Sequence, residues 1–108
     1  MKGYRYELYI DNEYQGCGIF QGMEDIEKSR IIQSLFKELP IPPSNVFANT
    51  CQTTSFFTEK GKEKFKDSIT IAKSIYEEDL FNVRELIADV DEHDIVYQDK
   101  YQFIRKDF

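Results

Sequence analysis

The sequence is poor in the residues that build dedicated chemical sites, and it has no long hydrophobic run. Its 108 residues include no tryptophan, one histidine and two cysteines. That set does not supply the tetrahedral ligands of a structural zinc, and no stretch approaches the roughly 18 apolar residues of a membrane-spanning helix. The first ten residues lack the apolar core of a signal peptide. We therefore expect a cytoplasmic protein that does not enter a membrane, with Cys17 and Cys51 reduced and partly buried.

Acidic residues outnumber basic ones by 20 to 14, which gives a formal net charge of −6. This surplus argues against a nucleic-acid partner, because it repels a phosphate backbone, and it suits a basic protein partner. Hydrophobic residues make up 41% of the chain and aromatic residues 15%. The length and composition predict a packed core and a single domain over residues 1–108.

The start of the chain predicts a β-hairpin. Residues 4–10 alternate between two faces, and the face with Tyr4, Tyr6, Leu8 and Ile10 is apolar, as in a half-buried strand. Asp11 and Asn12 are turn formers, and residues 14–20 then return as a second strand. Gly16 and Gly18 lie within that strand, where glycine marks a bulge or the close approach of another backbone.

Helical periodicity replaces alternation after the hairpin. Residues 24–39 predict a helix whose apolar residues recur at helical spacing, and the prolines of residues 40–43 stop it. A second helix is predicted from a cap at Thr58 to about Tyr76. The two apolar stripes are Ile32, Leu35, Phe36 and Leu39 in the first helix, and Phe65, Ile69, Ala72 and Tyr76 in the second.

Strands are predicted before and after the second helix. A short strand covers about residues 51–57, another covers 83–90, and residues 95–104 are interpreted as one long strand. The alternative for the last segment is a tight turn at Asp99 and Lys100 that splits it in two. The order β-β-α-(β)-α-β-β predicts an α+β fold, with an antiparallel sheet of four to five strands and two helices packed on one face.

A polar turn at residues 89–94 gathers carboxylates beside the only histidine, His93. Oxygen ligands with an imidazole suit a divalent cation, so the candidate ligands are Asp89, Asp91 and Asp94. The spacing does not match a helix–loop–helix calcium loop, and aspartate is a common turn former. We interpret the segment as a solvated turn and expect no metal or other cofactor.

The one basic concentration is a set of alternating lysines at the start of the second predicted helix: Lys60, Lys62, Lys64 and Lys66. At two-residue spacing these side chains fan around a helix instead of lining one side. The pattern predicts at most a shallow anion site.

An enzyme site is the alternative function. The order of Arg5, a hydroxyl run ending at Ser55 and a later acid such as Glu85 resembles the arginine–serine–glutamate plan of ADP-ribosyltransferases. In that family the arginine and the hydroxyl orient NAD, and the glutamate assists transfer. The chain lacks the family's paired-glutamate turn. The resemblance implies a small nucleotide- or NAD-binding enzyme with its site around Arg5 and Ser55.

The leading hypothesis is a small acidic protein-interaction or regulatory module without catalytic activity. Tyr9 falls on the strand face opposite the apolar one, together with Arg5 and Glu7, so we expect it to offer an exposed aromatic contact. The long final strand suits self-association through a sheet edge, because its amides would otherwise stay unpaired. The expected partner is thus another protein or a second copy.

Overall fold

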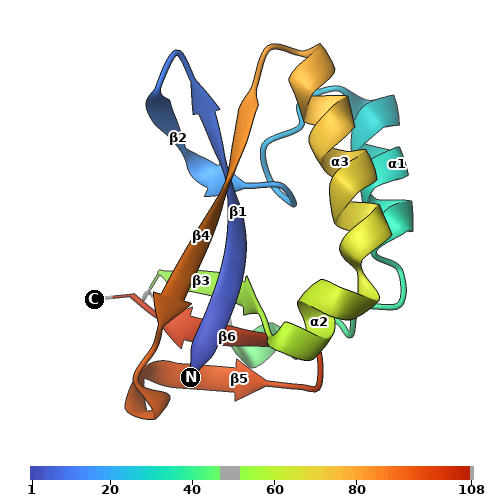
Figure 1. Cartoon of the computed structure of the whole chain (residues 1–108). Coiled ribbons are helices and arrows are strands. Elements are labelled where there is room, and N and C mark those ends of the chain that lie inside the picture. The colour runs from blue at the N-terminus through green and yellow to red at the C-terminus, as the bar shows by residue number, and fades with distance from the viewer. Residues whose placement is uncertain (47–51, 108) are drawn as a thin grey trace. The chain divides into compact units, whose positions relative to one another are not determined.

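The computed structural model describes residues 1–46 and 52–107, and its elements confirm the predicted α+β class (Figure 1). Within these residues there are six β-strands, three α-helices and two short 3-10 helices. The strands are β1 (Lys2–Ile10), β2 (Glu13–Gly18), β3 (Thr53–Phe57), β4 (Asn82–Asp89), β5 (Ile95–Gln98) and β6 (Gln102–Lys106). The helices are α1 (Ile26–Leu35), α2 (Glu59–Lys64) and α3 (Lys66–Glu78), with η1 (Ser44–Val46) and η2 (Glu92–Asp94) as 3-10 turns.

The chain forms two compact units. Unit 1 consists of Met1–Arg5, Leu39–Lys64 and Ile87–Phe108, and unit 2 consists of Tyr6–Glu38 and Phe65–Leu86. Strands β1 and β4 contribute residues to both units. The prediction that residues 1–108 fold as one domain stays a prediction.

Unit 1 is built on antiparallel pairing of β3 with β6 and of β6 with β5, and Tyr4 of β1 pairs with Phe57 of β3. Phe56 and Phe103 lie opposite each other in this register and stack with their ring centroids 5.3 Å apart. Both rings are buried together with Val90. The predicted strand at residues 51–57 is present from Thr53 onward, and Cys51 lies outside the described residues.

The prediction of one long strand over residues 95–104 is wrong, because a turn separates β5 from β6. Asp99 holds this turn: its carboxylate accepts hydrogen bonds from the backbone amides of Tyr101 and Gln102 and from the Tyr97 hydroxyl. Burial by itself would raise the pKa of Asp99, but these donors together lower it below its usual value. The hydrogen bonds to the Asp99 carboxylate therefore stabilise the turn that separates β5 from β6.

The split also changes which strand lies at the edge. Because β6 pairs with β3 on one side and β5 on the other, its amides are used within the sheet. Among the described residues β5 is the end strand of this path, and it is four residues long. The final strand is therefore not the free edge that the sequence suggested, and a short edge strand is a poor template for pairing.

In unit 2 the predicted hairpin is confirmed as β1 and β2. Ile10 pairs with Glu13 across a two-residue turn in which Asp11 (φ 49°) and Asn12 (φ 66°) both have positive φ, as the favoured hairpin turn requires. The register shifts farther along, and Gly16 (φ 76°) supplies the backbone geometry of that bulge.

The first helix is shorter than predicted, since α1 begins after Asp25 and ends at Leu35. Asp25 is its N-cap: its carboxylate accepts a hydrogen bond from the Lys28 amide at 3.0 Å. The expected apolar stripe buries Ile32 and Phe36.

The second predicted helix is two helices, α2 and α3, with a break at Phe65. The Thr58 cap is confirmed, because its hydroxyl accepts a hydrogen bond from the Gly61 amide. Phe65 leaves helical geometry (ψ 17°), and its buried ring packs 5.7 Å from Phe36. The predicted stripe of the second helix is buried as expected: Phe65, Ile69, Ala72 and Tyr76.

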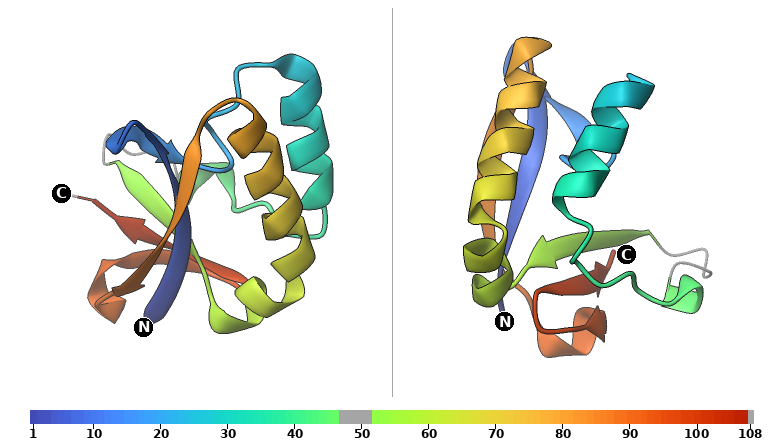
Figure 2. Two further views of the ribbon diagram at one scale, coloured as in Figure 1. Left: turned by 45° about the horizontal axis from the view of Figure 1, so that its top comes forward. Right: turned by 90° about the vertical axis from the view of Figure 1, so that its right-hand side faces the viewer.

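Helices α1 and α3 lie together on one side of the strands of unit 2 (Figure 2). Tyr76 is fully buried, and its hydroxyl donates to the Ile19 carbonyl at 2.6 Å. Burial raises the pKa of Tyr76 to about 12. Gly22 packs against Leu8 so closely that a Cβ there would collide with the leucine side chain. These contacts fix the segment after β2 against the helices.

Candidate binding surface and pocket

The side of the unit 2 strands opposite the helices presents two tyrosines and an arginine. Tyr9 and Tyr14 are direct partners in the β1–β2 register, with ring centroids 5.5 Å apart. The Arg84 guanidinium of β4 lies 4.1 Å from the centre of the Tyr9 ring. We call this set, together with Leu86, the open face.

Local structure explains why these side chains meet. Alternation along β1 sends Tyr6 and Leu8 into the helix-covered core and Tyr9 to the other side, and the same period places Arg84 and Leu86 together on β4. Arg84 also donates to the Asn12 side chain at 2.6 Å, which holds the guanidinium over the ring. Tyr9 is half-buried, so it is less exposed than predicted, whereas Tyr14 is 46% exposed and Leu86 41%.

Charge is distributed unevenly between the two units. Unit 2 holds twelve acidic and six basic residues, and unit 1 holds eight of each. The whole formal charge of −6 therefore belongs to unit 2. Carboxylates beside the open face in the sequence and register include Glu7, Asp11 and Glu13.

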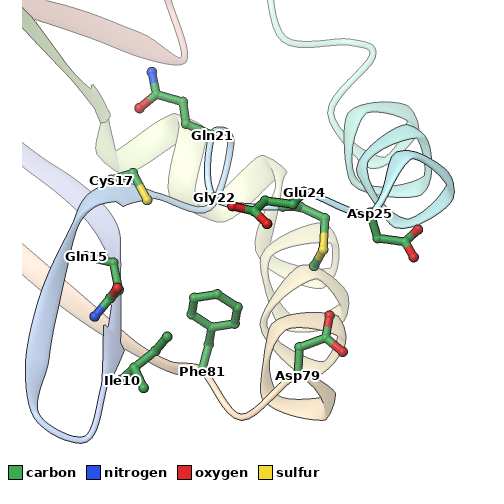
Figure 3. Close-up of a pocket in the computed structure, with 10 residues that line it drawn as sticks. Ile10, Gln15, Cys17, Gln21, Gly22, Glu24, Asp25, Asp79 and Phe81 are labelled. Carbon is green, nitrogen blue, oxygen red and sulfur yellow. The ribbon is translucent and has the colours of Figure 1, made fainter.

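A pocket of about 490 Å³ lies elsewhere in unit 2, between the β1–β2 hairpin, the segment after β2 and the end of α3 (Figure 3). In the figure the Phe81 ring stands in the middle of the site, with Gln15 and Cys17 on one side and Asp79 and Glu24 on the other. Three carboxylates line it, those of Glu24, Asp25 and Asp79, and its lining includes no basic side chain. We call it the acidic pocket.

The structure brings Arg5 and Ser55 together, but through the backbone. The Arg5 guanidinium donates to the Ser55 carbonyl oxygen at 3.2 Å, so the arginine ties β1 to β3 within unit 1. Glu85, the third residue of the ADP-ribosyltransferase-like order, belongs to unit 2, where it accepts a hydrogen bond from the Tyr6 hydroxyl at 2.8 Å. These hydrogen bonds of Arg5 and Glu85 thus join neighbouring strands of the protein.

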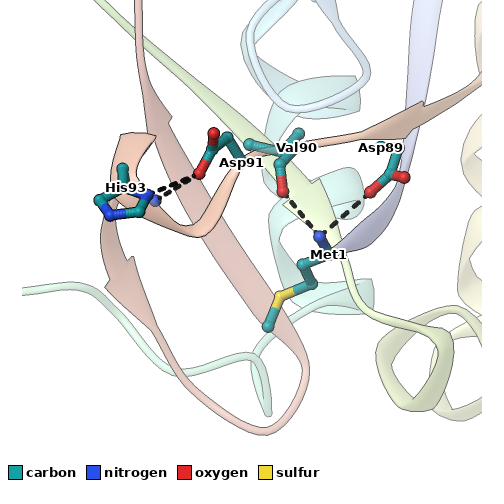
Figure 4. A network of polar contacts seen from close by, with 5 residues as sticks. All are labelled: Met1, Asp89, Val90, Asp91 and His93. Carbon is teal, nitrogen blue, oxygen red and sulfur yellow. Dashed lines mark hydrogen bonds and ion pairs between the residues drawn. The ribbon is translucent and has the colours of Figure 1, made fainter.

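The polar turn after β4 forms η2, and two acidic side chains that precede η2, Asp89 and Asp91, are engaged within the protein (Figure 4). The Asp91 carboxylate accepts a hydrogen bond from the backbone amide of His93 and also contacts its ring. Both interactions lower the pKa of Asp91, and the bond from the backbone amide has the larger effect. The Met1 amino group binds Asp89 and the Val90 carbonyl.

Asp89, Asp91 and Asp94 line one shallow groove, together with Arg105 and Lys106. The lining also includes Asp107, which pairs with the Arg105 guanidinium at 3.0 Å. Across residues 1–46 and 52–107, no three acidic, histidine or cysteine side chains are grouped as metal ligands.

Unit 1 carries a different surface, in which lysines lie over tyrosine rings. Lys62 lies 4.4 Å from the centre of the Tyr4 ring, and Lys64 and Lys100 lie 5.4 and 5.5 Å from that of Tyr101. Two of the four alternating lysines, Lys62 and Lys64, therefore lie over tyrosine rings.

No protein-family model matches this chain, and neither the curated proteins nor the solved structures give a significant match. No helix in the described part of the chain is both long and apolar enough to cross a membrane.

Tyr9 was a candidate contact from the sequence alone, whereas its neighbours Tyr14 and Arg84 were not. Tyr14 and Arg84 sit on alternating segments, which signals exposure, but only the strand register shows that they meet Tyr9. The acidic pocket has no local sequence motif, because its lining comes from three separate segments.

Proposed function

We propose that this protein is a non-catalytic cytoplasmic binding module that recognises a basic protein surface through the open face of unit 2. The observation that supports it is the contiguous row of Tyr14, Tyr9 and Arg84, which strand alternation places on the side away from the buried Tyr6 and Leu8. Tyrosine and arginine are the residue types most enriched where binding energy concentrates at protein interfaces.

Preorganisation adds to this argument. Arg84 is held by both Asn12 and the Tyr9 ring, so these side chains lose little conformational freedom when a partner packs on them. A tyrosine ring also offers a face to an incoming arginine or lysine.

Charge selects the class of partner. Since unit 2 carries the full net charge of −6, a basic surface is attracted to it and an acidic one is repelled. A basic protein segment can therefore use both the tyrosine rings of the open face and the negative charge of unit 2.

The test compares two labelled peptides of equal length by fluorescence anisotropy, one rich in lysine and one with glutamate at the same positions. We expect the lysine peptide to bind, with an affinity that falls as salt rises, and the glutamate peptide not to bind. Tyr14→Ala should weaken binding by about tenfold.

Ile31→Ala is the matched control, because Ile31 is 49% exposed on α1, on the helix side of the same unit. Its affinity should equal that of the wild type. Equal binding of the two peptides, or a larger loss from Ile31→Ala than from Tyr14→Ala, would contradict the proposal.

A further inference from the structure

We infer that the acidic pocket of unit 2 binds a primary ammonium group on an alkyl stem, as carried by a lysine side chain of the basic partner. This inference rests on the proposed function for the identity of the partner, but the chemistry of the pocket is argued from its own lining.

The volume and the walls fit an alkyl stem. The pocket measures about 490 Å³, and Ile10, Met23 and Phe81 give it apolar surface. The Phe81 ring is fixed from behind, because it packs edge-on against buried Tyr76 with the centroids 5.5 Å apart. Methylene groups of a lysine stem bury well against such walls while the charged end stays near polar groups.

The polar lining selects a cation. Asp25 and Asp79 are each engaged by Lys28, through its backbone amide and its ammonium group at 3.0 and 2.8 Å. Glu24 differs, since its carboxylate makes no hydrogen bond or ion pair with any other described residue. Glu24 and Phe81 both line the pocket (Figure 3), so we expect a bound ammonium to contact the carboxylate and the ring.

The neighbouring Lys28 ammonium responds to two of the same carboxylates, Asp79 and Asp25. Its pKa is raised, first by the hydrogen bond to Asp79 and then by the charges of Asp79, Glu78 and Asp25. The lysine does not line the pocket itself, so the space beside Glu24 remains open to a second cation.

The specificity follows from these contacts. A neutral stem of the same length keeps the apolar contacts but loses attraction to Glu24, and a carboxylate is repelled by Glu24, the one lining acid that Lys28 does not engage. The pocket should therefore rank butylammonium above 1-butanol, and 1-butanol above butyrate.

The experiment follows backbone amide shifts by NMR while each of these three small molecules is titrated into the intact chain. We expect butylammonium to shift the amides of Cys17, Glu24 and Phe81 with saturation, and butyrate to leave them in place. Glu24→Gln should weaken butylammonium binding about three- to fivefold, the scale of one exposed ion pair.

Glu27→Gln is the matched control, because Glu27 is an exposed acid in the first turn of α1 outside the pocket lining. Phe81→Leu is a second probe and should weaken binding by a similar factor through loss of the ring. Equal shifts with butylammonium and 1-butanol, shifts outside the pocket, or equal losses from Glu24→Gln and Glu27→Gln would overturn the inference.

This result is separable from the proposed function. If the lysine peptide binds and Tyr14→Ala weakens that binding, while butylammonium does not bind in the acidic pocket, the proposed function is supported and the inference fails. If butylammonium binds as described but no basic peptide does, the pocket stands and the proposed function fails.

Discussion

Unit 1 and unit 2 differ in their net charge and in whether their polar side chains are buried in hydrogen-bond networks or exposed at the surface. In unit 1, charges balance, and Asp99 and the buried Gln102 join a hydrogen-bond network that shapes the chain. In unit 2 the core is almost wholly apolar, the charge is −6, and Tyr14, Arg84 and Glu24 stand at the surface. In unit 1 a polar network thus shapes a turn of the chain, whereas unit 2 carries the acidic surplus and exposes Tyr14, Arg84 and Glu24 at its surface.

Gly61→Ala should produce the largest loss of stability, and it tests how tightly unit 1 is built. A Cβ at this position would collide with the backbone carbonyl of Tyr101, which has no flexible end that can move aside. Although alanine favours a helix by about 1 kcal/mol over glycine, we expect a net loss of about 3 kcal/mol. Urea unfolding measures it.

Gly16→Ala in unit 2 is the control for that variant. Gly16 has positive φ, but a Cβ there meets no atom within 4 Å. The expected cost is about 1 kcal/mol, from backbone strain alone. An equal or larger cost than that of Gly61→Ala would contradict the difference in packing.

Asp99→Ala should cost about 2 kcal/mol, because it removes a charged acceptor of several hydrogen bonds in the β5–β6 turn. The folded state lowers the pKa of Asp99, so its contribution is present above the unfolded pKa near 3.9 and is lost as pH falls through the lower folded value. The stability difference from wild type should therefore shrink below about pH 4.

Urea unfolding of Asp99→Ala at pH 7 and pH 3 checks this, with Glu92→Ala as a control of equal charge change in unit 1. Glu92 is exposed, and its removal should change the free energy of unfolding by less than about 0.5 kcal/mol. A difference for Asp99→Ala that stays constant from pH 7 to pH 3 would show that the ionised carboxylate is not what holds the turn.

Tyr76→Phe should cost about 1 kcal/mol in unit 2, because it leaves the Ile19 carbonyl without its hydroxyl donor. The folded pKa of about 12 lies above the unfolded value of 10.0, so this group's stabilisation is complete below pH 10 and is lost as pH rises toward 12. The wild type should thus lose stability relative to Tyr76→Phe over that range. Unfolding curves at pH 8, 10 and 11 measure the change, and a constant difference would contradict the account.

Much of the fold could be predicted because alternation and helical spacing report burial directly. Tyr4, Tyr6, Leu8 and the stripe from Phe65 to Tyr76 are buried as expected, whereas Ile10 at the end of the same predicted face is 37% exposed. The break at Asp99 was the alternative and not the preferred interpretation, because alternation continues through it and the decisive donors come from three other residues. The break at Phe65 was missed because the apolar stripe is unaffected by it.

The candidate sites were less predictable, since they depend on register and on distant segments. Tyr9 could be assigned to the solvent side from its position alone, but its contact with Arg84 spans 75 positions of sequence. Arg5 and Ser55 are in contact, but their hydrogen bond uses a backbone oxygen that no motif identifies, and a binding site there stays a prediction.

The most direct test of the central claim is a map of amide chemical shifts as the lysine-rich peptide is titrated into the intact chain. The account predicts that the perturbed amides cluster in unit 2, around Tyr9, Tyr14 and Arg84, and that those near Tyr4 and Tyr101 in unit 1 stay unchanged. Perturbations confined to unit 1, or none in either unit at saturating peptide, would contradict it.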